Sequence, residues 1–172
     1  GEASDDERRL LAQLDGVLAQ SEIADAMLPR AAAFVPQLMA LLRHGDASVA
    51  SIAERIAQDA PLAAEVLRVA AAAAQGGMPV QDLPQAVQRI GAARVQRAVA
   101  RVVFRPMYAG SDGSLGARAA PWLWLLAERC AEGAAARAAA AGLPAFDGYL
   151  GGLLHGTGWT TALRVADRAG LG

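Results

Sequence analysis

Few residues in this sequence could bind a metal ion or act as a nucleophile. The chain has two histidines, His44 and His155, and one cysteine, Cys130. Metal-dependent hydrolysis needs several ligands to activate water and neutralise phosphate charge, and one imidazole cannot hold such an ion. A lone histidine at a helix end, such as His155 before Gly156, is typical of a cap donor or a satisfied buried group. Cys130 lies among alanines and is predicted to be a core thiol. We therefore predict no catalytic residue, metal ligand or cofactor.

Four arginines in the middle of the chain recur at helical spacing. Arg94, Arg97, Arg101 and Arg105 follow one another at intervals of three, four and four, so on a helix they form one basic stripe. A solvated face is the simpler interpretation, and a docking strip for an acidic partner or a phosphate-rich ligand is the functional one. A reader of double-stranded DNA is disfavoured, because the net charge is -1 and no recognition helix stands out. We take the four arginines as candidate partner-binding residues.

The three tryptophans are Trp122, Trp124 and Trp159. Trp122 and Trp124 are two positions apart, so one helix cannot bury both on the same face. One of the two is expected either at an exposed interface or packed on the neighbouring linker. Trp124 and Trp159 complete the set of candidate partner-binding residues.

The elements that would position these residues are all helical. Apolar residues recur at helical spacing and strand-like alternation is absent. Helix starts are expected at Ser4, Ser48, Asp59 and Asp82, which are typical N-cap residues. A glycine- and serine-rich stretch over 109–120 predicts a linker. The expected helices run from about residue 35 to 43, 49 to 58, 60 to 75, 83 to 91, 92 to 107, 121 to 141, 145 to 155 and 160 to 169.

Composition limits the class of protein further. The 172 residues suffice for one domain or two small lobes that share a core. A single cysteine excludes an internal disulfide and fits a reducing compartment. No apolar run reaches the roughly 18–20 residues that a membrane span needs. We therefore expect a cytoplasmic protein.

Four ordered stretches together resemble the HDOD family, whose fold is related to the HD-domain phosphohydrolases. Each stretch joins a cap residue to an inward apolar stripe, and the order and separations are more specific than any one piece. The stretches are Leu28-Pro29 with Val35-Pro36-Gln37-Leu38, Gln58-Asp59-Ala60-Pro61-Leu62 with Val66-Leu67-Arg68, Gln85-Ala86-Val87 with Arg89-Ile90-Gly91, and Leu150-Gly151-Gly152-Leu153-Leu154-His155.

The resemblance implies a compact multi-helix bundle in two lobes. Residues 1–27 are expected to form a helical extension, 28–108 the first HDOD lobe, and 121–172 a degenerate HD-like lobe that is apparently truncated. The family's His-Asp dyad corresponds here to His155-Gly156, so the resemblance implies a vestigial metal position. Trp159 stands where the family often has lysine, and we expect it to fill the vestigial pocket.

By resemblance, the expected function is that of a non-enzymatic bacterial signal-transduction domain that binds proteins, with a small ligand as a further option. The expected partners belong to second-messenger or two-component signalling, and a homodimer is an option; neither membrane nor nucleic-acid binding is expected. The groove between the lobes, near the arginine stripe and His155, is the expected partner surface. Two alternatives stay open: a metal-dependent phosphohydrolase or nucleotide-binding module of the HD superfamily, and a structural oligomerisation domain.

Overall fold

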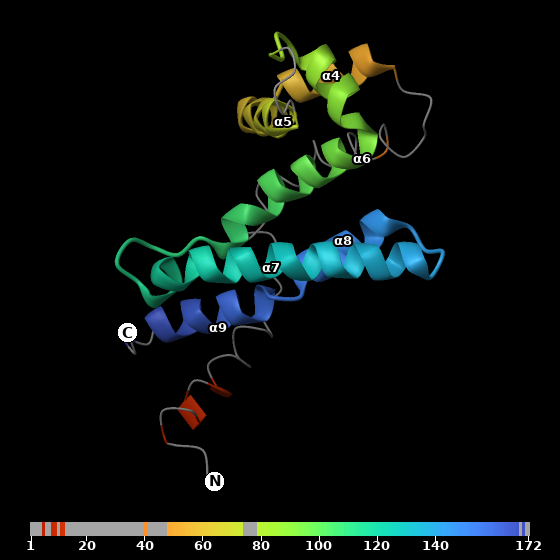
Figure 1. Ribbon diagram of the computed structural model, residues 1–172. Helices are drawn as coiled ribbons and strands as arrows, with labels where there is room; N and C mark the ends of the chain where they lie inside the picture. Colours follow the sequence, from red (N-terminus) through yellow and green to blue (C-terminus); the bar gives the residue numbers. More distant parts are fainter. Residues whose placement is uncertain are drawn as a thin grey trace. The chain divides into compact units, whose positions relative to one another are not determined.

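The computed structural model describes residues 5, 8–9, 11–12, 40, 48–73, 79–168 and 170. The part of the chain that it describes is helical and contains no strand (Figure 1), which confirms the predicted all-α class. None of its described helices has the length and apolar character needed to cross a membrane. The longer elements are α4 (Val49–Ala57), α5 (Ala60–Ala72), α6 (Leu83–Phe104), η1 (Arg105–Tyr108), α7 (Leu115–Ala140), α8 (Ala145–Leu154) and α9 (Thr157–Arg168).

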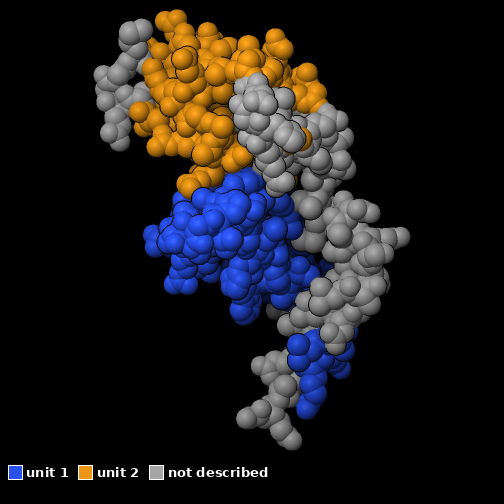
Figure 2. Space-filling view, turned by 90° about the vertical axis from the view of Figure 1, so that its right-hand side faces the viewer, with its two compact units in different colours: residues 1–29, 104–172 blue, residues 30–103 orange. Residues whose placement is uncertain are grey.

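The chain divides into two compact units, coloured separately in Figure 2. One unit is Arg30–Val103 and the other combines Gly1–Pro29 with Phe104–Gly172. The expected division of the chain into an extension, two lobes and a linker remains a prediction. The helix expected over 35–43, the extension over 1–27 and His44 lie wholly or largely outside the described residues.

The helices of the unit Arg30–Val103 begin at the predicted cap residues. The Ser48 hydroxyl accepts from the Ser51 amide at 3.1 Å at the start of α4, and the Asp59 carboxylate accepts from Leu62 at 2.9 Å at the start of α5. Asp82 does the same for Gln85 at 2.8 Å before α6. Each bond satisfies an amide that the helix itself leaves without an acceptor.

One apolar core holds this unit together. The fully buried side chains from α4, α5 and α6 include Ile56, Val66, Val95 and Val99. Gly91 interrupts α6 with φ of 75°, a left-handed conformation that glycine adopts without a steric penalty. The chain therefore changes direction at the position where the sequence predicts a helix end.

The unit that contains Phe104–Gly172 is built on α7, with α8 and α9 packed along it (Figure 1). Helices α7 and α8 approach closely because α8 carries small residues at the contact. A Cβ added at Gly152 would lie 2.5 Å from the Cys130 carbonyl oxygen and 2.6 Å from the Ala131 Cα. Tyr149 and Leu153 of α8 are almost fully buried beside this contact.

Helix α7 begins earlier than predicted. It starts at Leu115 rather than near Pro121, and the Ser114 hydroxyl caps it by accepting from the Ala117 amide at 3.0 Å. The second half of the expected linker over 109–120 is therefore helical, and Pro121 lies inside the helix. The predicted stop at Gly142 is confirmed, since this residue has φ of 72°.

Candidate functional site

The residues expected to correspond to the family's dyad, His155 and Gly156, lie at the end of α8. His155 is the C-cap residue of that helix, and its side chain is exposed. Its backbone amide donates to the Gly151 carbonyl at 3.1 Å. Gly156 follows in the turn that leads into α9. The helix end thus presents one imidazole, and the next residue brings no carboxylate.

Tyr108 occupies the space beside this turn. Its buried hydroxyl donates to the Leu153 carbonyl at 2.5 Å. A Cβ placed on Gly156 would meet the same hydroxyl at 3.3 Å, which is tighter than ordinary van der Waals contact. A carboxylate side chain at position 156 would therefore require Tyr108 to shift.

The Tyr108 ring is held from its other side by Trp124. The two ring centroids are 5.4 Å apart in an edge-to-face arrangement at 69°, which is a favourable geometry for aromatic pairs. Burial raises the pKa of the Tyr108 phenol, and Cys130 adds to the effect. The phenol therefore stays neutral and remains a hydrogen-bond donor at physiological pH.

Helix α9 is fixed to the rest of this unit by two charged side chains. The Asp167 carboxylate accepts from the amides of Leu115 at 2.7 Å and Gly116 at 3.0 Å. The bond from Gly116 lowers the pKa of Asp167, partial desolvation opposes this, and the bond from Leu115 lowers it further. Arg164 donates to the carbonyls of Met107 at 2.9 Å and Ala109 at 3.0 Å.

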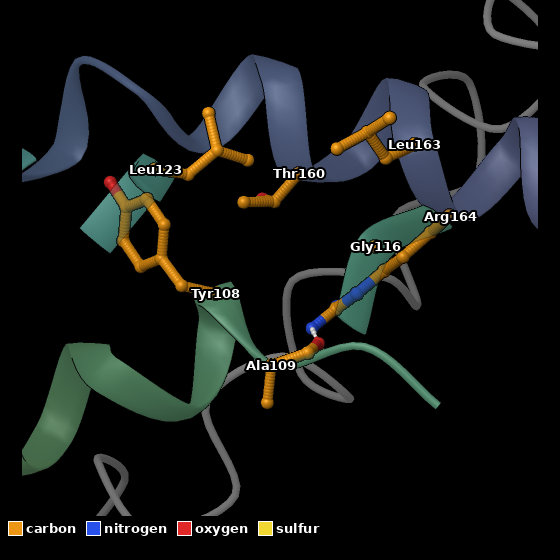
Figure 3. A pocket seen from close by; sticks show the side chains of 7 residues that line it. All are labelled: Tyr108, Ala109, Gly116, Leu123, Thr160, Leu163 and Arg164. Atoms are coloured by element: carbon orange, nitrogen blue, oxygen red, sulfur yellow. Dashed lines mark hydrogen bonds between the residues drawn. The ribbon is translucent and has the colours of Figure 1, made fainter. Parts of the chain in front are cut away.

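A shallow depression lies beside Arg164 (Figure 3). It leaves no room even for a water molecule, and the Arg164 side chain already reaches a backbone carbonyl there. It therefore offers no space for a ligand. The lining residues are Tyr108, Ala109, Gly116, Leu123, Thr160, Leu163 and Arg164.

The four arginines do not form one uniform stripe. Arg94 is exposed and Arg97 half-buried on α6, while Arg101 forms an ion pair with Glu65 of α5 at 3.2 Å. Arg105 belongs to η1, a 3₁₀ helix in the other compact unit. The predicted α-helical face therefore ends before Arg105, and an intramolecular carboxylate already engages Arg101.

The tryptophans separate as the spacing predicts, with Trp122 exposed and Trp124 buried. Their exposed fractions are 75% and 9%. Trp124 was expected at a partner surface, but it packs on Tyr108 in the core. Trp159 is 67% exposed, so the expectation that it fills a pocket is wrong. It remains a candidate for partner contact.

The structure thus joins Gly156 to Trp124 through Tyr108, a residue that sequence reasoning did not single out. The sequence marks Tyr108 only as the end of the expected first lobe, and no local spacing signals its contact with a helix end 45 residues later. Asp167 was also missed, because it lies in a polar helix end that resembles any solvated surface.

Comparisons with known proteins identify a family for the sequence and a similar solved fold. The HDOD domain matches residues 28–169. No curated protein matches the chain. The fold is similar to a crystal structure described as "Putative metal-dependent phosphohydrolase from Shewanella amazonensis SB2B", with a TM-score of 0.63 and 21% identity. That alignment covers 94% of this chain and 60% of the other, so this chain spans less than two thirds of that protein. The match over residues 28–169 shows that the chain belongs to the HDOD domain family.

Proposed function

We propose that this HDOD domain is a non-enzymatic signal-transduction module that acts in the bacterial cytoplasm through contacts with proteins of second-messenger or two-component signalling. The observation that carries the proposal is the packing of Gly156 against the Tyr108 hydroxyl, at 3.3 Å from a Cβ built there. A hydrolase of the HD type would need a carboxylate at this position. Here a neutral phenol committed to the Leu153 carbonyl occupies the adjoining space.

The donor groups near His155 do not fit a metal centre. Among the described residues, no three His, Cys, Asp or Glu side chains are placed to share an ion. Asp167, the acidic residue of α9, is engaged by two backbone amides of α7. The name of the structural neighbour makes hydrolysis the alternative function, so the experiment must separate the two.

Metal analysis of the purified protein is the direct test. After incubation with Mn²⁺ or Fe²⁺ and gel filtration, we expect far less than one ion per chain, with no difference between wild type and His155→Ala. Gly156→Asp alone should bind no more metal than the wild type. Combining Gly156→Asp with Tyr108→Phe also removes the crowding hydroxyl, so comparing the two variants distinguishes the effect of the missing carboxylate from that of the limited space. Stoichiometric metal that is lost in His155→Ala, together with hydrolysis of a phosphorylated compound, would refute the proposal.

Partner contact is tested on α6. Arg94 is exposed, so Arg94→Glu reverses surface charge there without removing the ion pair between Arg101 and Glu65. Arg168→Glu at the exposed end of α9 is the matched control. In a two-hybrid screen against signalling proteins, we expect the first variant to lose interactions that the second keeps. Equal effects of the two variants would remove α6 from the partner surface.

A further inference from the structure

The outward face of α7 carries a regular seam of exposed residues. The inward face contributes Trp124, Ala127, Ala131 and Ala135 to the core against α8 and α9. On another face of α7, residues recur at alternating intervals of three and four, and all of these residues are exposed. We call this set the α7 seam: Trp122, Leu125, Arg129, Glu132, Ala136 and Ala139.

The first part of the seam does not have the composition of a solvated face. Trp122 is 75% exposed, and Leu125 and Leu126 are 42% and 53% exposed on adjoining positions. Alternation of three and four residues is the heptad spacing with which one helix packs along another. Large apolar side chains that gather on one exposed face mark an interaction site more often than scattered ones do.

The order of residues along the seam makes it complementary to a second copy of itself. Its first half carries two large side chains and then Arg129, and its second half carries Glu132 and then two alanines. The alternating spacing makes Trp122, Arg129 and Ala136 heptad a positions, and Leu125, Glu132 and Ala139 d positions. When two such helices pair antiparallel, each a position of one helix faces a d position of the other. Trp122 then meets Ala139 of the second copy, Leu125 meets Ala136, and Arg129 meets Glu132.

Every layer of this pairing is complementary. Large side chains face small ones, and opposite charges meet in the two central layers. A two-fold axis repeats each contact, as an isologous interface requires. Parallel pairing in register would instead place Trp122 on Trp122 and Arg129 on Arg129, where like charges repel.

The surface beside the seam is open at one glycine. Gly133 lies next to the seam, and a Cβ built there has no atom within 4 Å. Leu126, which flanks the seam one turn from Trp122, would reach this open position on the second copy. We propose that this protein forms a homodimer through antiparallel pairing of α7 seams, an interface that is separate from the proposed signalling contacts on α6.

Charge reversal tests the pairing and its direction together. By sedimentation equilibrium, we expect the wild type to dimerise and Arg129→Glu or Glu132→Arg to weaken the dimer by about tenfold, since each puts like charges into both central layers. The double variant Arg129→Glu/Glu132→Arg should recover the wild-type affinity. Arg168→Glu, which changes charge away from the seam, should have no effect. A wild type that stays monomeric, or a double variant as weak as the single ones, would overturn the proposal.

Cysteine pairing gives the register independently. In a Cys130→Ala background, we would prepare Leu125→Cys and Ala136→Cys separately, mix them under reducing conditions and then oxidise. Position 125 faces position 136 in the proposed register, and two copies of position 125 are about 16 Å apart along the helix axis. A disulfide dimer should therefore form in the mixture and not in either variant alone. A disulfide formed by Leu125→Cys alone would contradict the antiparallel register.

Discussion

The contact between α7 and α8 gives the sharpest prediction about stability. We compare Gly152→Ala with Gly151→Ala, two neighbouring positions in α8 that differ in one respect. The Cβ of the first would lie 2.5 Å from the Cys130 carbonyl oxygen, and the Cβ of the second meets no atom within 4 Å. Both variants gain the same helix propensity, about 0.5–1 kcal/mol, so their difference isolates the packing.

The expected loss of stability follows from how far α8 must move away from α7 to relieve the contact. Ordinary contact between such atoms begins at about 3.5 Å, so α8 must move away from α7 by about 1 Å. The obstructing atoms belong to the backbone and cannot turn aside as a flexible side chain would. Overpacking of this kind costs about 1–3 kcal/mol. We expect Gly152→Ala to be less stable than Gly151→Ala by about that amount.

Tryptophan fluorescence during urea unfolding is the suitable assay. All three tryptophans lie in the unit that contains α7 and α8, so the signal reports that unit alone. Measurements at one protein concentration with unchanged m-values give comparable free energies of unfolding. Equal midpoints for the two variants would show that α8 does not approach α7 as closely as described.

Three further predictions concern single side chains. Tyr108→Phe should lower the free energy of unfolding by about 1 kcal/mol, because the ring keeps its contacts while the buried Leu153 carbonyl loses its donor; urea unfolding measures this, and no loss would remove the bond from the account. The folded-state pKa of Asp167 is lowered, so its charge stabilises the fold above its unfolded pKa of about 3.9, and this contribution is lost as the pH falls through the folded value. Thermal unfolding should therefore show Asp167→Asn less stable than wild type at pH 6 and converging with it in acid, and a gap that is independent of pH would contradict this. Gly142→Ala should cost about 1–2 kcal/mol, because φ of 72° is left-handed; Gly142→Asn should cost less in the same melts, and equal losses would point to another cause.

The sequence predicts local features of this fold well. The N-caps Ser48, Asp59 and Asp82 and the stops at Gly91 and Gly142 all depend on backbone groups within a few residues. Such signals are readable because the cap residue itself supplies the missing bond or the required φ. The start of α7 was misplaced for a related reason. Proline favours the first turn of a helix, so Pro121 suggested a helix start near itself. The true N-cap is Ser114.

The candidate site was harder to predict because it depends on contacts between distant segments. The spacing of Trp122 and Trp124 shows that they diverge, but only packing on Tyr108 decides which one is buried. Arg101 and Glu65 form an ion pair between α6 and α5. Their positions in the sequence do not indicate that these two side chains meet. Periodicity therefore identifies a helix face, whereas its surroundings decide whether that face is available to a partner.

The hydrogen bonds of Asp167 join segments that leave the ribosome at different times. The amides that it accepts from lie 52 and 51 residues earlier in the chain. At about 5–20 residues per second, the ribosome makes the first turn of α7 roughly 3–10 seconds before the side chain that will satisfy it. During that interval the nascent helix has only Ser114 at its start. Synthesis of the end of α9 is therefore the step that allows α7 to be fixed along its whole length.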